Sequence, residues 1–289
     1  MSDCRPLVSV ILPVLNGEKS LVIALKSIVD QTYDNWELFV LDDGSIDKSV
    51  TIINDIQDHR VFPILPNHDR GLALRLNQGI HMANGKYIAR MDADDISFPE
   101  RLARQVEFLE AHPDVDLVGT RILVFRDDGS VIGHPFFAES HDAICARPWN
   151  GFPLPHPTWM GRADWFRRHQ YAVPEYKRAE DQELLLRTHE VSTFACLPDV
   201  LLAYRQGPFC LKKTLVGRAN LLKAQIHCLL RSSKYLMIFK SLVIFGIKCV
   251  VDFFASLPML DALYFWRMSA KPATKDVIIF KKIYNKYSI

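Results

Sequence analysis

The chain has 289 residues, of which 49% are hydrophobic and 24% are charged, so it can bury a substantial core and is not intrinsically disordered. Its six cysteines form no CxxC pair and no apolar signal-peptide region follows Met1, so we expect a cytosolic protein without disulfides or structural zinc. The net charge of +2 conceals a division: residues 1–211 contain 21 Lys and Arg against 30 Asp and Glu, whereas residues 212–289 contain 14 against 3. We therefore expect two regions with different partners.

Strands and helices are predicted to alternate over the first hundred residues. The run LVSVIL at residues 7–12 is apolar throughout and rich in β-branched residues, as expected of a strand buried on both faces. Further strands are predicted at residues 36–41, 61–65 and 85–91, and helices at residues 19–31, 47–56 and 72–82. This alternation predicts βαβ crossovers and an α/β fold with a mostly parallel sheet.

The fourth predicted strand ends in a cluster of carboxylates. Asp92, Asp94 and Asp95 fall within four positions, and like charges this close repel one another unless a cation lies among them. If the extended backbone continues, Asp92 and Asp94 leave it on the same face, where their oxygens could share Mg²⁺ or Mn²⁺. A solvated loop or a helix cap before Pro99 would also explain these residues, without any metal.

Polar residues also follow the first two predicted strands. Pro13, Asn16 and Glu18 come after the first strand, and Asp42 and Asp43 come after the second. Because ligands bind beyond the carboxyl ends of parallel strands, these residues and the carboxylate cluster are expected on one rim. A divalent cation would bridge so acidic a rim to a diphosphate. The chain has no GxxxxGK[ST], and no GxGxxG follows the first strand, so P-loop and dinucleotide-binding interpretations lose their main support.

Three stretches of the chain resemble the nucleotide-binding half of family 2 glycosyltransferases, which are inverting enzymes of the GT-A fold. They read VSVILPVLNGE, QTYDNWELFVLDDGSIDKS and NQGIHMANGKYIARMDADDISFPERL. The resemblance implies a GT-A-like, Rossmann-type sheet with a nucleotide-binding half at residues 1–98 and an acceptor half at residues 99–211. Residues 212–289 would then form a basic, helical C-terminal extension.

The resemblance also implies roles for single residues. Asp94 would bind the Mg²⁺ or Mn²⁺ directly, and Asp92 would lie near the metal and the ribose. Asp42 and Asp95 match less specifically and would orient the loop and begin the next helix. The nucleoside of a sugar nucleotide would be contacted by Pro13, Asn16, Glu18 and Asp43. Residues that open the helix at 72–82 would face the phosphates or only solvent: Arg70, Gly71, Arg75 and Asn77.

The next segment is less regular. An amphipathic helix is predicted at residues 99–111, a hairpin from strands at 116–125 and 130–133, and a strand at 194–204 that is interrupted at Pro198. His156 resembles a histidine that the family often has before its acceptor region, although a proline-flanked histidine can be merely structural. Trp159 and Trp165 would either stack on a sugar or fill the core.

A second candidate for chemistry is the run RAEDQELLLR at residues 178–187. As plain structure, Glu180 and Asp181 are first-turn acids favoured by the helix dipole. The pair also resembles the family's ED motif, whose Asp is the general base. Asp181 is then the residue that would take the proton of the acceptor hydroxyl.

The chain between residues 235 and 257 is apolar but contains Lys240, Lys248 and Asp252, so it lacks the uninterrupted run that a membrane-spanning helix needs. On a helical wheel these residues and Ser241 share one side. The opposite side carries Leu236, Ile238, Phe239, Leu242, Val243, Ile247, Val250, Phe253 and Phe254. Together with the basic charge, this pattern predicts a helix lying in the interface of an anionic membrane, or else packing on the catalytic domain or on a second subunit. Nucleic acid is not an expected partner, since the aromatic residues lie on the apolar side.

These observations predict a metal-dependent glycosyltransferase that moves one sugar from a UDP-sugar to an acceptor hydroxyl. A lipid-linked oligosaccharide of bacterial surface-polysaccharide assembly, reached from the cytoplasmic face of the membrane, is the expected acceptor. Two alternatives remain at this point. A metal-dependent phosphatase could use an Asp-x-Asp after a parallel strand, and a non-catalytic sugar-nucleotide or lipid-binding adaptor would keep the basic extension.

Overall fold

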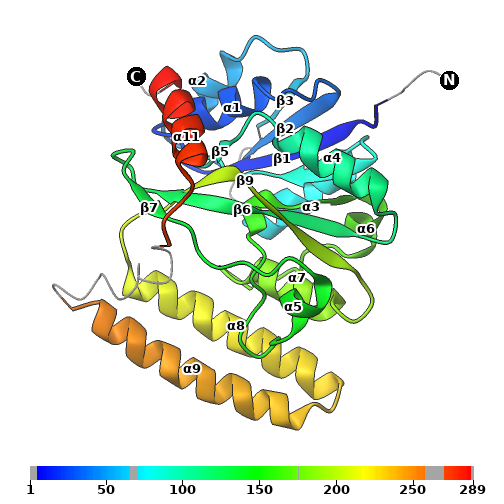
Figure 1. Ribbon diagram of the computed structural model, residues 1–289, viewed down its shortest axis with the longest axis vertical. Helices are drawn as coiled ribbons and strands as arrows, with labels where there is room; N and C mark the ends of the chain where they lie inside the picture. The colour runs from blue at the N-terminus through cyan, green and yellow to red at the C-terminus, as the bar shows by residue number, and fades with distance from the viewer. Residues whose placement is uncertain (1–4, 66–70, 175, 258–269, 288–289) are drawn as a thin grey trace.

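A single mixed sheet organises the fold, in the order β3-β2-β1-β4-β8-β6-β9-β5, with β7 paired to β6 (Figure 1). The computed structural model describes residues 5–65, 71–174, 176–257 and 270–287. The strands are β1 (Val8–Val14), β2 (Trp36–Asp42), β3 (Val61–Ile64), β4 (Tyr87–Arg90), β5 (Ile96–Ser97), β6 (Leu117–Phe125), β7 (Val131–Gly133), β8 (Met160–Arg162) and β9 (Phe194–Arg205). The helices are α1 (Leu21–Val29), α2 (Ser49–Asn54), α3 (Leu72–Met82), α4 (Arg101–Ala111), α5 (His141–Cys145), α6 (Ala163–Arg168), α7 (Glu180–Thr188), α8 (Leu211–Arg231), α9 (Tyr235–Ala255) and α11 (Thr274–Tyr287), with a 3₁₀ turn, η1, at His156–Thr158.

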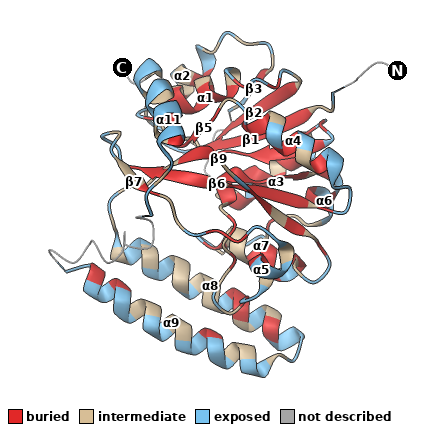
Figure 2. Ribbon diagram, in the orientation of Figure 1, coloured by how far each residue is buried: buried red, intermediate tan, exposed pale blue. Residues whose placement is uncertain are grey.

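The parallel half of the sheet confirms the predicted βαβ units. β1 pairs in parallel with both β2 and β4, and β2 pairs in parallel with β3. Every residue of β1 and β2 is buried, which explains why these strands read as apolar runs rather than as alternating patterns (Figure 2). α3 lies directly on β1, because Gly79 has no side chain to collide with Ile11.

The other half of the sheet is mixed. β8 enters between β4 and β6, antiparallel to both, while β6 runs parallel to β9 and antiparallel to β7. The predicted hairpin of β6 and β7 is confirmed. β9 is one strand of 12 residues, and the predicted interruption at Pro198 is a local register shift: Leu197 pairs with Thr120, whereas Val200 pairs with Arg121.

The C-terminal helices occupy two separate places. α11 returns to the sheet, where the buried Phe280 packs against Phe125 in a tilted arrangement, with ring centroids 4.8 Å apart. α8 packs on α7, and α9 packs on the outer side of α8 at the edge of the molecule (Figure 1). In the described part of the chain, none of the helices is both long enough and apolar enough to cross a bilayer.

Candidate active site

A cleft of about 600 Å³ opens beyond the carboxyl ends of β1, β2 and β4. The first half of the chain contributes Pro13, Asp43 and Asp92 to its wall, and the second half contributes Glu180 and Asp181. The chain therefore brings four of the predicted site residues, Pro13, Asp43, Asp92 and Asp181, together around one space. This is the location that the rule for parallel sheets predicts.

Asp43 forms the floor of this cleft with Arg75 of α3. The Nε of Arg75 donates to Oδ1 of Asp43 at 2.6 Å, and the backbone N–H of Gly71 donates to Oδ2 at 3.0 Å. Both side chains of the ion pair are almost completely buried. The carboxylate is thereby held in one orientation at the end of β2. Arg70, which the sequence placed beside these residues, lies outside the described residues.

Asn16, Glu18 and Asp42 hold the loop that follows β2. Oδ1 of Asn16 accepts a hydrogen bond from the N–H of Ile46 at 2.9 Å, and Oε2 of Glu18 accepts one from the N–H of Lys48 at 3.2 Å. Oδ2 of Asp42 accepts hydrogen bonds from the N–H groups of Gly44 and Ser45, two and three residues further along the chain. Asn16 and Glu18 are not among the described residues that line the cleft, so their predicted contact with the nucleoside stays a prediction, whereas Asp42 orients the loop as expected.

Arg90, at the end of β4, is a residue of the cleft that the sequence analysis missed. Its guanidinium donates to both oxygens of Asp92, at 2.8 and 2.5 Å, and is itself buried. Asp92 is therefore held by Arg90 in a bidentate pair rather than turned freely toward a metal. The sequence did contain a signal for this ion pair. An arginine in the apolar strand YIAR needs a partner, and Asp92, two positions further on, lies on the same face of an extended chain.

Asp92, Asp94 and Asp95 can each place one carboxylate oxygen within 4.8 Å of the others. Although Asp94 is exposed to solvent, the protein around its carboxylate and the negative charge of Asp92 raise the pKa of Asp94 to about 6. Burial, together with the negative charges of Asp94 and Asp92, also raises the pKa of Asp95, and its Oδ2 has no hydrogen-bond partner among the described residues. Burial and mutual repulsion make it costly to ionise these carboxylates. A hard divalent cation bound among them would offset that cost, so the three side chains fit Mg²⁺ or Mn²⁺ as ligands. Asp94 is the accessible member of the cluster, and Asp95 is fixed from behind by the N–H of Arg205 at 2.9 Å.

His156 lies in the wall of the cleft, whereas the two tryptophans do not. Nε2 of His156 is hydrogen-bonded to the hydroxyl of Tyr171 at 2.7 Å. Burial, with the nearby charge of Arg90, lowers the pKa of His156 well below its usual value, so the imidazole is neutral. Trp159 and Trp165 are 0% and 1% exposed and donate to Leu154 and Ser192, which makes them part of the core.

Asp181 lies in the first turn of α7, facing the cleft. Burial raises its pKa, although Nε2 of Gln182 donates to its Oδ2 at 3.1 Å. A carboxylate whose charge is poorly solvated is a better proton acceptor than an ordinary aspartate. The loop before it is braced by α8: Asn220 donates to the carbonyl of Lys177 at 2.9 Å, and Gly217 passes close to Arg178, which has a φ of 63°.

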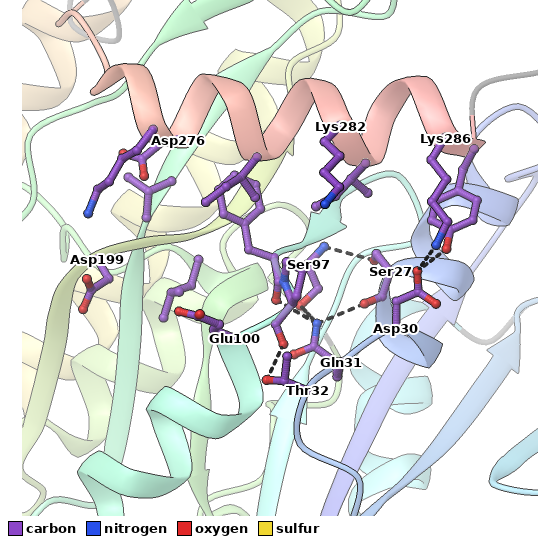
Figure 3. Close-up of a pocket in the computed structure, with 18 residues that line it drawn as sticks. Ser27, Asp30, Gln31, Thr32, Ser97, Glu100, Asp199, Asp276, Lys282 and Lys286 are labelled. Atoms are coloured by element: carbon purple, nitrogen blue, oxygen red, sulfur yellow. Dashed lines mark hydrogen bonds and ion pairs between the residues drawn. The ribbon is translucent and has the colours of Figure 1, made fainter.

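A second cavity, of about 670 Å³, lies under α11, and Asp92, Asp94 and Asp95 are not among the described residues that line it (Figure 3). Two of its polar side chains, Gln31 and Lys286, are paired within the protein. Gln31 donates to Ser27, Ser97 and Phe98, and Lys286 is bonded to Asp30 at 2.7 Å. None of the predicted site residues is among the described residues that line this cavity, so we assign the chemistry to the acidic cleft.

Comparison with known proteins agrees with this geometry. Residues 9–170, more than half of the chain, match the family described as Glycosyl transferase family 2. EpsE of Bacillus subtilis strain 168, a protein named as a glycosyltransferase, is 38% identical over 190 residues, which are 64% of this chain and 67% of that one. WfaP of Escherichia coli, a UDP-Glc:alpha-D-GlcNAc-diphosphoundecaprenol beta-1,3-glucosyltransferase, is 36% identical over 104 residues, which are 36% of this chain and 41% of its own.

Two solved structures share the fold. The structure of S. aureus TarS in complex with UDP-GlcNAc superposes with a TM-score of 0.63 at 17% identity, covering 97% of this chain and 91% of that one. The mannosyltransferase PcManGT of Pyrobaculum calidifontis, in complex with GDP-Man and Mn²⁺, superposes with a TM-score of 0.57 at 18% identity, covering 99% and 84%. The chain is therefore a GT-A glycosyltransferase that uses a nucleotide-sugar donor, and it belongs to glycosyl transferase family 2.

Proposed function

We propose that this enzyme transfers one sugar, with inversion, from a UDP-sugar to a hydroxyl of a lipid-linked oligosaccharide in the assembly of a bacterial surface polysaccharide. The observation that carries the proposal is the meeting of Asp43, Asp92 and Asp181 in one cleft of about 600 Å³. Inversion requires a base and a departing diphosphate in the same space. The cleft offers Asp181 for the first and, through Asp92, reaches the metal-fitting carboxylate cluster for the second.

In this proposal Asp181 accepts the proton of the acceptor hydroxyl as its oxygen attacks the anomeric carbon. Asp43, fixed by Arg75, accepts hydrogen bonds from the base of the donor, and Pro13 packs beside it. Asp94, with Asp92 beside it, would hold Mg²⁺ or Mn²⁺, which when bound stabilises the negative charge on the leaving diphosphate. Arg90 keeps Asp92 in position. PcManGT, whose structure contains Mn²⁺, supports the choice of cation.

The choice of UDP is supported by the relatives, since WfaP is named for UDP-Glc and TarS was solved with UDP-GlcNAc. WfaP is also named for a diphosphoundecaprenol acceptor, which supports a lipid-linked acceptor here. An acceptor of this kind would place the enzyme at the cytoplasmic face of the membrane, attached peripherally. The family assignment removes the grounds for the phosphatase and for the non-catalytic adaptor.

The test is release of nucleoside diphosphate from a panel of UDP-sugars and GDP-sugars, with Mn²⁺, with Mg²⁺ and with EDTA. We expect turnover with a UDP-sugar and a divalent cation, and loss of turnover with EDTA. Asp181→Asn should lower kcat by at least about a hundredfold with little change in UDP affinity, because it removes the base alone. Asp164→Asn, at an exposed first-turn acid of α6, is the matched control. Full turnover by Asp181→Asn would remove this residue from the mechanism.

A further inference from the structure

α9 is packed with its polar side inward and its apolar side outward. Ser241, Asp252 and Ala255 are buried against the rest of the protein. Large apolar residues are 38 to 67% exposed along the whole helix: Leu236, Phe239, Leu242, Val243, Ile247, Val250, Val251, Phe253 and Phe254, with Leu257 just beyond its end. Their spacing of three and four residues makes one continuous stripe, which we term the outer face of α9 (Figure 2). A helix on the surface of a soluble protein normally buries its apolar side and exposes its polar side.

The inward side of α9 is held by specific polar contacts. Arg218 of α8 forms a two-contact ion pair with Asp252, whose side chain is 2% exposed. Lys248 donates to the carbonyl of Asn150 at 2.8 Å, and the ammonium of Lys240 lies 4.3 Å from the ring centre of Trp149. Turning the helix over would move Asp252 into solvent and leave the guanidinium of Arg218, which is 14% exposed, against an apolar surface without its carboxylate partner, which is expensive. The orientation of the outer face is therefore fixed by the sequence.

We infer that the outer face of α9 inserts into the headgroup region of an anionic membrane. α8 carries exposed cations at Lys212, Lys213, Lys223 and Arg231, whereas the single acid of α8 and α9, Asp252, is buried and paired. Anionic lipid would neutralise these cations while the apolar stripe enters the acyl boundary. A second copy docking by the same face would bring the cations of two chains together, so the charge favours lipid as the partner.

The inserted helix would also place the cleft relative to the membrane. α9 packs on α8, and α8 holds the loop at Lys177 and Arg178 that forms part of the cleft wall and precedes Asp181. The outer face and the part of the cleft wall formed by Lys177 and Arg178 are thus joined through one helix. The inference that the partner is a membrane rests on the proposed lipid-linked acceptor. The exposure of the outer face is observed independently of that proposal.

The test is co-sedimentation of the full-length protein with vesicles of phosphatidylcholine alone or mixed with phosphatidylglycerol. We expect binding to the anionic vesicles, and a loss of at least about tenfold in the partition coefficient for Ile247→Glu/Val250→Glu, which puts two charges in the middle of the outer face. The matched control is Ile46→Glu/Phe136→Glu, at apolar residues that are 93% and 84% exposed elsewhere, and it should bind as the wild type does.

Three results would overturn the inference: no binding of the wild type to anionic vesicles, equal binding by the α9 variant, or a wild-type dimer in sedimentation equilibrium that the same variant converts to a monomer. The proposed chemistry fails separately, because release of nucleoside diphosphate is measured without vesicles. A protein that turns over a UDP-sugar but does not bind lipid would retain the function and lose this inference.

Discussion

At the scale of single residues, the cleft and the carboxylate cluster beside it contain charged groups that the fold holds in unfavourable surroundings. Burial raises the pKa of Asp181, and the pKa of Asp94 is raised to about 6. Arg90 is buried and satisfied mainly by one carboxylate, that of Asp92. Groups arranged in this way lower the stability of the empty protein, and they are the groups that binding and catalysis would use.

Asp181→Asn is expected to stabilise the protein while abolishing turnover. Because the pKa of Asp181 is raised by folding, the ionised carboxylate favours the unfolded chain once the pH rises through the folded-state value. Asparagine cannot ionise, so the variant should melt at a higher temperature than the wild type at pH 7, and the difference should vanish near pH 3. The raised pKa of Asp181 should also appear in the pH profile of kcat/KM. The fall of kcat/KM on the acid side should occur at a pH above the usual pKa of an aspartate. Identical melting temperatures at neutral pH would contradict this.

The pair of Arg90 and Asp92 can be tested against an exposed pair in the same protein. Arg90→Met leaves Asp92 without its partner, and breaking a buried ion pair is expected to lower the free energy of unfolding by about 3–5 kcal/mol. Arg5→Met breaks the ion pair of Arg5 with Asp34, in which the two side chains are 62% and 75% exposed. This change should lower the free energy of unfolding by at most about 1 kcal/mol. Urea denaturation measures both, and equal losses would show that Arg90 has no special structural role.

At the scale of helices and strands, the sequence predicted the elements whose hydrophobic pattern is visible within one short segment. β1 and β2 are apolar runs, and the carboxylate cluster follows β4, so the sheet, the rim and the position of Asp181 at the start of α7 could be anticipated. β8 could not, because three residues join the sheet only through partners from distant segments, β4 and β6. For α9 the sequence separated a polar from an apolar side, but only tertiary contacts, such as those of Asp252 with Arg218, show which side faces the protein.

α11 shows how much a distant element contributes to the core. Phe280 is fully buried against Phe125, whereas Ile278, two residues away on the same helix, is 62% exposed. Phe280→Ala should lower the free energy of unfolding by about 3–5 kcal/mol through lost packing and a new cavity. Ile278→Ala should change it by no more than about 0.5 kcal/mol. Chemical denaturation of the two variants checks this, and a small effect at Phe280 would mean that α11 is only loosely attached.

At the scale of the whole molecule, binding at the acidic cleft and stability of the chain are linked. Mn²⁺ together with UDP should raise the free energy of unfolding by about 2.7 kcal/mol at a hundred times the dissociation constant. Calorimetry with and without EDTA measures this shift in melting temperature. Asp94→Asn should reduce the shift strongly, and Asp114→Asn, at an exposed acid outside the cleft, should leave it intact. A shift that survives Asp94→Asn would place the cation elsewhere.

The hydrogen bond from Asn220 to the carbonyl of Lys177, with the close passage of Gly217 beside Arg178, has one more consequence. A long helix and the entrance of the cleft are connected there without any flexible linker between them. If α9 rests on a bilayer, the cleft is held at a fixed distance from the membrane surface. An acceptor whose lipid end stays in that bilayer can then offer only the sugar that lies at this distance. Acceptor length, rather than sugar chemistry alone, would then decide which hydroxyl is glycosylated.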